Sequence, residues 1–280
     1  MSASSATPST GIIVAAYQQA EALRLLLAAL AAAPETDFAV CIADDGSAPR
    51  MDEELAAEAA SLPFPVRFEW QPDNGFRKAE IQNLAAAGLP CELQIFLDGD
   101  CIPHRNLVEV YRQAYRPGEF FVGSVNFLDV ETSRALTPGQ VADGAHERFV
   151  DRRQEWKIRK THWKNRLYRG RKLVRPRIRG GNFAVSRDLF LAVDGFDEVF
   201  GGHGKEDSDI RNRMRNAGAA GVSLWTSARA CHLSREVAPS GERTDAPTEL
   251  YREGQSLVRA RRGISSHTRA ANQGDEDSRT

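Results

Sequence analysis

Two carboxylates near residue 98 could hold a divalent cation. Asp98-Gly99-Asp100 directly follows LQIFL, a run apolar enough to be a buried strand. Side chains two positions apart in an extended chain point the same way, and Gly99 leaves room for a bend or a ligand. Carboxylate oxygens suit Mg²⁺ or Mn²⁺ shared with a diphosphate. An acidic turn that merely ends a strand explains the same residues, so this motif alone leaves both interpretations open.

A second acidic turn, Asp44-Asp45-Gly46-Ser47, also follows an apolar run. Carboxylates in this position can accept hydrogen bonds from a nucleobase N–H or from ribose hydroxyls. An Asx-turn that leads into a helix N-cap is the alternative interpretation.

The third cluster, Glu206-Asp207-Ser208-Asp209, opens a predicted helix after a glycine-rich turn. The helix dipole stabilises acids there, but three acids in four residues exceed what capping needs. One carboxylate could act as a general base toward a substrate hydroxyl. His232 ends a later predicted strand and is either a structural histidine or a nitrogen ligand that completes a Mn²⁺ site.

Apolar runs without a helical period predict the strands that position these clusters. They cover residues 11–17, 38–43, 66–70, 93–97, 120–125, 181–186 and 222–225. Predicted helices lie between most of them, at residues 19–33, 51–62, 77–88, 104–115 and 206–216. This alternation predicts an α/β fold with a central, mostly parallel sheet flanked by helices, and ligands at the carboxyl ends of its strands. The absence of GxGxxG after the first strand and of GxxxxGK[ST] argues against dinucleotide and P-loop sites.

The net charge of −1, from 37 basic and 38 acidic residues among 280, hides an uneven distribution. Residues 1–140 carry a net charge of −10 and residues 141–280 a net charge of +9. The segment 151–180 holds 13 Lys/Arg against two acids, with Phe149, Trp156, Trp163 and Leu167 at helical spacing. The segment has several open interpretations: peripheral contact with an anionic membrane, binding of an anionic acceptor, packing against the acidic N-terminal half, or a solvated basic face whose aromatic residues dock on the core. No nucleic-acid module accompanies the segment, so nucleic acid is not an expected partner.

Compartment and domain boundaries follow from composition. No apolar run approaches the ~18–20 residues of a membrane span, the N-terminus lacks a signal peptide, and four cysteines are too few for a disulfide framework. We therefore expect a cytoplasmic protein. Residues 1–10 are predicted to be a disordered leader, residues 11–237 the folded domain, and residues 238–280 a polar, loosely packed or disordered tail. Within the domain we expect a nucleotide-binding part at 11–103 and an acceptor and catalytic part at 104–237.

The motifs together resemble inverting glycosyltransferases of family 2, which have the GT-A fold. The resemblance is carried by IIVAAY, ADDGS, NGFRKAEIQN and FLDGDCIP. The stretch RGGNFAVSRDLFLAVDGFDEVFGGHGKEDSD is similar to the C-terminal motif of β-1,4-galactosyltransferases and chondroitin-polymerase-like enzymes. Taken together, the resemblance to these enzymes spans roughly residues 11–235.

The resemblance implies a role for each matching residue. Donor binding is assigned to Ala15, Tyr17, Asp44, Asp45, Phe76, Lys78, Asp98 and Gly99, with Phe76 against the uracil, and to a donor-sugar floor of Gly180, Gly181 and Asn182. Asp100 and His232 would bind the cation, normally Mn²⁺. Glu206 would hold the sugar or acceptor, and Asp207 would be the catalytic base. His203 stands where the family usually carries Trp in the acceptor-site turn, and it would meet the acceptor instead.

The implied function is transfer of a hexose or N-acetylhexosamine from a UDP-sugar to a hydroxyl of a glycan or glycolipid, with inversion and a divalent cation. Its implied setting is bacterial cell-surface polysaccharide synthesis at the inner face of the membrane. Two alternatives are a glycosyltransferase for a small-molecule aglycone and a non-catalytic module that binds a sugar nucleotide or glycan.

Overall fold

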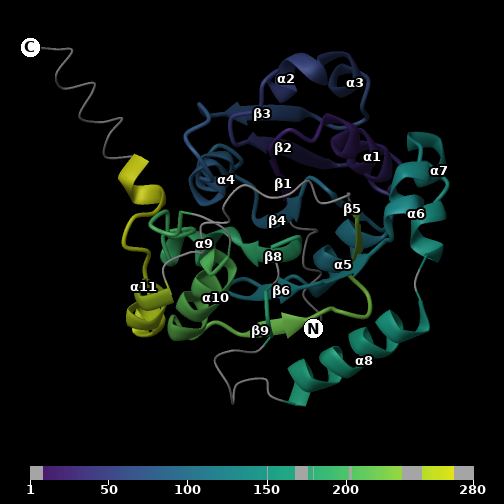
Figure 1. Ribbon diagram of the computed structural model, residues 1–280. Helices are drawn as coiled ribbons and strands as arrows, with labels where there is room; N and C mark the ends of the chain where they lie inside the picture. The colour runs from purple at the N-terminus through teal and green to yellow at the C-terminus, as the bar shows by residue number, and fades with distance from the viewer. Residues whose placement is uncertain are drawn as a thin grey trace, which may run out of the picture.

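A mixed sheet runs through the centre of the molecule, with helices on both faces (Figure 1). The computed structural model describes residues 9–149, 151–167, 176–178, 180–201, 204–234 and 248–267. The seven strands of this sheet lie in the order β3-β2-β1-β4-β8-β6-β9. Their bounds are β1 (Thr10–Ala16), β2 (Phe38–Asp44), β3 (Val66–Trp70), β4 (Leu93–Asp98), β6 (Phe120–Val122), β8 (Asn182–Ser186) and β9 (Gly221–Ser223).

Strands β3, β2, β1 and β4 run parallel to one another, and β8 runs antiparallel to both β4 and β6. Ala15 pairs with Ala43 on one side and with Asp98 on the other. The carboxyl ends of β1, β2 and β4 therefore meet at one edge, where the acidic turns that follow β2 and β4 lie on either side of the end of β1.

Both faces of the sheet are buried, as the unbroken apolar runs predict. Ile12 and Val14 belong to a core cluster with α1 and α5, whereas Ile13 and Phe96 belong to another with α4, α9 and α10. The alternation follows from the two-residue period of a strand. In the second cluster the rings of Phe96 and Phe183 stack with centroids 4.9 Å apart.

The helices connect and cover the strands. Their bounds are α1 (Ala20–Ala31), α2 (Met51–Glu54), α3 (Ala56–Ala60), α4 (Lys78–Ala87), α5 (Leu107–Ala114), α6 (Val130–Ala135), α7 (Pro138–Ala142), α8 (Arg152–Leu167), α9 (Arg187–Ala192), α10 (Glu206–Asn216) and α11 (Thr248–Glu253), with 3₁₀ turns η1 (Ala145–Arg148) and η2 (Gly254–Ser256). The predicted helix over 51–62 is two short helices that meet at Leu55. No helix within the described ranges is both long and apolar enough to cross a bilayer.

A small second sheet, in the order β5-β10-β7, was not anticipated. It contains β5 (Cys101–Pro103), β7 (Ser124–Phe127) and β10 (Arg229–His232). The predicted strand over 120–125 divides at Gly123, where a Cβ would lie 2.3 Å from Asn182 Nδ2. Antiparallel pairing of β10 with β5 places His232 opposite Cys101, next to the turn that carries Asp100.

The chain beyond residue 247 packs on the domain over its described part, in contrast to the loosely packed tail that its polar composition predicts. Arg261 Nη1 lies 3.3 Å from Asp197 Oδ2, and Arg262 Nε lies 3.0 Å from Glu198 Oε2. Ile264 is buried against the second core cluster. Composition misses this packing because ion pairs to buried carboxylates, rather than apolar residues, supply most of it.

Candidate active site

A cleft of about 660 Å³ opens at the carboxyl ends of β1, β2 and β4. Most residues assigned to donor, cation or catalysis line it: Ala15, Tyr17, Asp45, Phe76, Lys78, Asp98, Gly99, Asp100, Gly180, Glu206, Asp207 and His232. The fold thus brings together side chains up to 217 positions apart in the chain. A larger cavity of about 1010 Å³, between the start of α1 and the α6–α7 connection, contains none of them.

Asp45 lines this cleft and is held in place by two donors. Gln71 Nε2 donates to its Oδ1 at 2.5 Å, and the backbone N–H of Arg77 donates to its Oδ2 at 2.9 Å. Burial raises the pKa of Asp45, although both hydrogen bonds act in the opposite direction. Nearby, the Tyr17 hydroxyl donates to Asp73 Oδ2 at 3.0 Å, which raises the pKa of Tyr17.

Asp44 does not reach the cleft, which corrects the nucleotide-binding role implied for it. Ser47 donates to its Oδ1 from both the backbone N–H, at 2.9 Å, and the hydroxyl, at 2.5 Å. The backbone N–H of Met51 donates to Oδ2 at 3.0 Å. Both oxygens are therefore engaged in the turn that leads to α2, as the Asx-turn interpretation has it.

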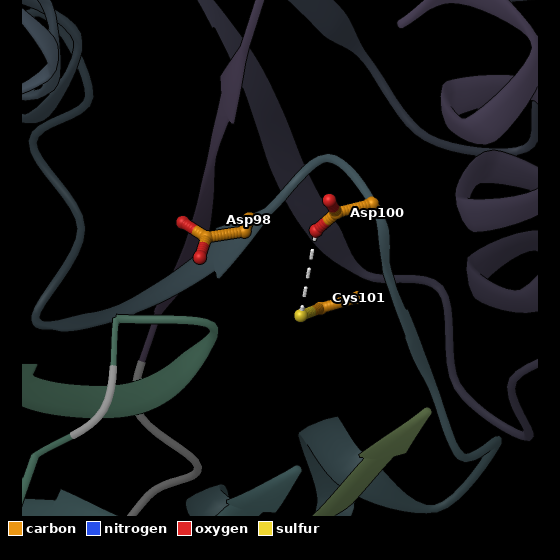
Figure 2. Close-up of side chains that lie close together, drawn as sticks. All are labelled: Asp98, Asp100 and Cys101. Carbon is orange, nitrogen blue, oxygen red and sulfur yellow. Dashed lines mark hydrogen bonds between the residues drawn. The ribbon is translucent and has the colours of Figure 1, made fainter. Parts of the chain in front are cut away.

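Asp100 and His232 lie together in the cleft and form its candidate cation half. Their Oδ2 and Nε2 atoms lie 3.6 Å apart, and within the described residues His232 Nδ1 is buried without a hydrogen-bond partner. Figure 2 shows the Asp98 and Asp100 carboxylates at the turn after β4, with Cys101 beside them; one ligand atom of each lies within 4.8 Å of the others. Burial raises the pKa of Cys101 well above its usual value, so its neutral thiol donates to Asp100 Oδ1 at 3.8 Å. Two carboxylates and an imidazole fit Mn²⁺ or Mg²⁺, whereas a neutral thiol does not contribute a ligand.

Asp98 faces the other half of the site. Its Oδ1 accepts a short hydrogen bond from Lys78 Nζ, at the start of α4. Burial by itself would lower the pKa of Lys78, but the carboxylates of Asp98, Asp207 and Glu206 together raise it. Lys78 therefore stays charged and balances part of the negative charge of three acids.

Asp207 and Glu206 reach the cleft from the first turn of α10. Gly180 N–H donates to Asp207 Oδ2 at 2.6 Å. Burial, Glu206 and Asp98 raise the pKa of Asp207 to about 7, against the lowering effect of Lys78. Glu206 is 6% exposed, and its Oε2 has no hydrogen-bond partner in the part of the chain that is described. The pair thus offers a carboxylate that exchanges a proton near neutral pH and a buried acceptor with free capacity.

The residue before this helix has an unusual backbone conformation. Lys205 adopts φ +87° and follows Gly204 at φ +89°. A side chain with positive φ is strained, and such strain clusters at functional sites. The strained turn aims the N-terminus of α10, and with it Glu206 and Asp207, at the cleft.

The three residues of the predicted sugar floor differ in where they lie. Gly180 lines the cleft, where a Cβ would lie 2.9 Å from Asp207 Oδ2 and 3.0 Å from Lys78 Nζ. Gly181 is needed for packing, because its Cβ would lie 2.5 Å from Cys101 Sγ. Asn182 is fully buried outside the cleft: Tyr111 donates to its Oδ1 at 2.7 Å, and its Nδ2 donates to the carbonyls of Ser124 and Ala228. Its amide therefore joins the two sheets instead of facing a donor.

His203 lies outside the described residues. Asp73 and Gln19 also line the cleft, and neither was predicted from the sequence. Asp73 follows β3 in the turn QPDNG, so the strand-end argument that selected Asp45 could have found it. Gln19 carries no such signal; its Oε1 is buried without a partner among the described residues, and a Cβ on Gly99 would lie 2.7 Å from it.

Comparison with known proteins identifies related glycosyltransferases. Residues 11–190 match the model of glycosyl transferase family 2, and residues 161–234 match the model of the N-terminal domain of galactosyltransferase. Chondroitin synthase of Escherichia coli is 25% identical over 229 residues, which cover 74% of this chain and 32% of that protein. The chain thus spans about a third of the length of this curated relative.

Solved structures share the fold at low sequence identity. GalNAc-T7 with UDP, GalNAc and Mn²⁺ aligns with a TM-score of 0.58 and 14% identity, over 82% of this chain and 45% of that one. Mannosyltransferase PcManGT from Pyrobaculum calidifontis, with GDP-Man and Mn²⁺, aligns at 0.57 and 16% identity over 91% and 70% of the two chains. The S. aureus TarS fragment 1–349 gives 0.56 and 15% over 80% and 60%. These chains share the GT-A fold, and since the family model covers more than half of the sequence, this protein is a glycosyltransferase that belongs to family 2.

Proposed function

We propose that the protein transfers a hexose or N-acetylhexosamine from a UDP-sugar to a hydroxyl of a glycan or glycolipid, with inversion and with a divalent cation. The observation that carries the proposal is the division of the cleft into two halves. Asp100 and His232 form one half, and Asp207, with a pKa near 7, lies with Glu206 in the other. Leaving-group binding and base catalysis therefore have separate groups within one cavity.

The chain's own residues account for a single displacement. Asp207 removes the proton from the acceptor hydroxyl, and the hydroxyl oxygen forms a bond to the anomeric carbon of the donor sugar. The bond from that carbon to the diphosphate oxygen breaks, and its electron pair leaves with UDP. Glu206 accepts a hydrogen bond from the donor sugar or the acceptor through Oε2, and Asp45 accepts one from the base or the ribose. One base and one leaving group suffice for inversion, whereas a retaining double displacement also needs a nucleophile.

Asp100 and His232 would hold the cation, with Asp98 beside them. When bound, Mn²⁺ or Mg²⁺ supplies positive charge that offsets the negative charge growing on the departing diphosphate. Both GalNAc-T7 and PcManGT were solved with Mn²⁺ and a nucleotide or sugar nucleotide, which supports this choice for the present chain.

A screen for UDP release tests the proposal. Purified protein is incubated with Mn²⁺, a panel of UDP-hexoses and UDP-N-acetylhexosamines, and glycan, glycolipid or small hydroxylated acceptors. We expect one donor to release UDP faster with an acceptor than without it. GDP-mannose is the control for the nucleotide base, and we expect no acceptor-dependent release of GDP from it. Release with a small aglycone alone would favour that acceptor class. Absence of release from every pair, together with UDP binding, would favour a non-catalytic module.

The pH dependence of transfer should follow Asp207. A base must be deprotonated, so kcat/KM should rise with pH through about 7, the pKa of this carboxyl. The Glu206 carboxylate raises that pKa, so Glu206→Gln should move the rising limb to lower pH even if it also weakens acceptor binding. If kcat/KM rises over the same pH range in Glu206→Gln as in the wild type, Asp207 is not the group that titrates. The measurement is UDP release at subsaturating acceptor between pH 5 and 9, a range that brackets the titration of a group near neutrality.

A further inference from the structure

The outer face of α8 carries an apolar stripe that no described part of the chain covers. Trp156 and Trp163 are 61% and 66% exposed, and Leu167 is 58% exposed. Positions i, i+7 and i+11 lie within about 40° of one another around a helix, so the three side chains form one ridge. This rules out the interpretation that these aromatic residues dock the helix on the core.

The inner face of α8 explains why the ridge points outward. Asn165 Nδ2 donates to Ser223 Oγ at 3.2 Å, and Glu155 pairs with Arg229. Gln154 accepts from the backbone N–H of Phe127 at 3.1 Å and donates to its carbonyl at 2.9 Å. Among the described side chains, Ile158 is the one fully apolar residue that α8 buries. Polar contacts thus fix the rotation of the helix, and they keep its tryptophans in solvent.

Basic residues flank the ridge on both sides. The helix carries seven Lys or Arg residues and a single acid, Glu155. At 100° per residue, Lys157 and Lys164 lie on one side of the ridge, Arg159 and Arg166 lie on the other, and Lys160 lies within it. Lys160 Nζ sits 4.4 Å from the centre of the Trp156 ring.

The apolar surface continues from α8 toward the cleft. Phe127 and Phe149, 51% and 47% exposed, line a hollow of about 500 Å³ next to Gln154. The Phe127 ring lies 4.8 Å from the His232 ring, measured between centroids. A partner that covers the ridge therefore also lies beside the cation half of the active site. In Figure 1, α8 lies at the periphery of the molecule, beyond the edge strand β9 of the central sheet.

We propose that the outer face of α8, with Phe127 and Phe149, docks on the surface of an anionic membrane. A convex ridge of Trp and Leu bordered by Lys and Arg is the arrangement by which a helix lies in the plane of a bilayer interface. The Trp rings sit at headgroup depth, and the basic side chains bind anionic headgroups on either side. A soluble polyanion would account for the charges but not for three exposed apolar side chains on the same ridge.

Co-sedimentation of the full chain with vesicles tests this proposal without any glycosyl transfer. We expect binding to vesicles of equal parts phosphatidylglycerol and phosphatidylcholine, a blue shift of tryptophan emission on binding, and little binding to phosphatidylcholine alone. Added salt should weaken binding, because headgroup attraction is screened. Failure of the protein to bind the anionic vesicles would overturn the proposal, whatever the outcome of the UDP-release screen.

Two variants separate insertion from charge. Trp156→Ala/Trp163→Ala should bind anionic vesicles at least tenfold more weakly, since buried apolar area is lost. Lys157→Gln/Lys160→Gln/Lys164→Gln should bind on the order of 100-fold more weakly. Trp70→Ala, on the edge strand β3, is the matched control and should bind like the wild type. Thermal unfolding checks that each variant is folded.

The double Trp variant also distinguishes a membrane from a glycan. If it binds the vesicles as tightly as the wild type does, charge alone carries the interaction and the membrane proposal fails. Wild-type binding to soluble dextran sulfate that exceeds vesicle binding and is unchanged in the Trp variant would assign the face to an anionic polysaccharide instead.

Discussion

Asp207→Asn should lower kcat by about 10³-fold while UDP binding with Mn²⁺ stays within a few-fold of the wild type. The amide keeps the size of the carboxyl and a polar contact to Gly180, but it cannot accept a proton from the acceptor hydroxyl. Loss of general-base catalysis typically costs 10²- to 10⁴-fold, and here one side chain carries that role. Single-turnover transfer measures the chemical step, and calorimetry measures nucleotide affinity.

The same substitution should stabilise the protein at alkaline pH when neither substrate nor cation is present. The folded state raises the pKa of Asp207 to about 7, whereas an unfolded Asp titrates near 3.9. Folding therefore favours the protonated form of Asp207. The contribution of this carboxyl to the free energy of unfolding is fully present below pH 4 and is lost as pH rises toward 7. Asn is neutral throughout, so the variant should melt roughly 3–6 °C higher than the wild type at pH 8, with a gap that shrinks toward pH 5.

Glu206→Gln is the matched control, because it removes the same charge from the adjacent residue. Glu206→Gln should keep measurable transfer, with kcat/KM rising at lower pH than in the wild type, whereas Asp207→Asn should lose transfer at every pH. Near-normal turnover in Asp207→Asn would rule out Asp207 as the base. Equal losses in both variants would indicate that the charge of the cluster, rather than one carboxylate, matters.

The parallel half of the sheet and the acidic turns were predictable from sequence because they rest on local patterns. Unbroken apolar runs locate β1, β2 and β4 to within one or two residues, and parallel strands must place their carboxyl ends together. That rule alone predicts that Asp45, Asp98 and Asp100 lie at the same edge of the sheet. The family motifs then supplied Lys78, which no local pattern would select, and singled out Asp207 within the acidic cluster that opens α10.

What the sequence did not reveal depends on long-range pairing. Strand β5 has three residues and exists because β10 pairs with it, which is what positions His232. Asp44 and Asp45 look equivalent in sequence, yet their side chains alternate across the strand end, so one caps the turn and the other faces the cleft. Asn182 looks like a ligand-binding amide, but the junction of two sheets uses all its hydrogen-bonding groups. Exposure of Trp156 and Trp163 follows from the polar inner face of α8, which periodicity alone cannot distinguish from a core-facing stripe.

The second large effect concerns Asp100. Asp100→Ala should weaken UDP binding in the presence of Mn²⁺ by about 100-fold or more, since even residues that only orient a metal ligand are worth about 10- to 100-fold in metal affinity. Its carboxylate lies 3.6 Å from His232 and would supply the negative charge that a hard cation requires. Binding without Mn²⁺ should change little, because we propose that Asp45, not Asp100, contacts the base or the ribose.

Asp45→Asn provides the control for Asp100→Ala, because it removes a carboxylate that lines the same cleft but does not belong to the candidate cation site. It should weaken UDP binding to a similar degree with and without Mn²⁺, whereas Asp100→Ala should remove the dependence on Mn²⁺ itself. Titration of each variant with UDP, at fixed Mn²⁺ and in a chelator, separates the two patterns. The rise in melting temperature caused by Mn²⁺ alone gives a second readout, since a cation that binds only the folded state stabilises it. If Asp100→Ala retains both the Mn²⁺-dependent affinity and the Mn²⁺-induced stabilisation, the cation is held elsewhere, and the division of the cleft into a leaving-group half and a base half is wrong.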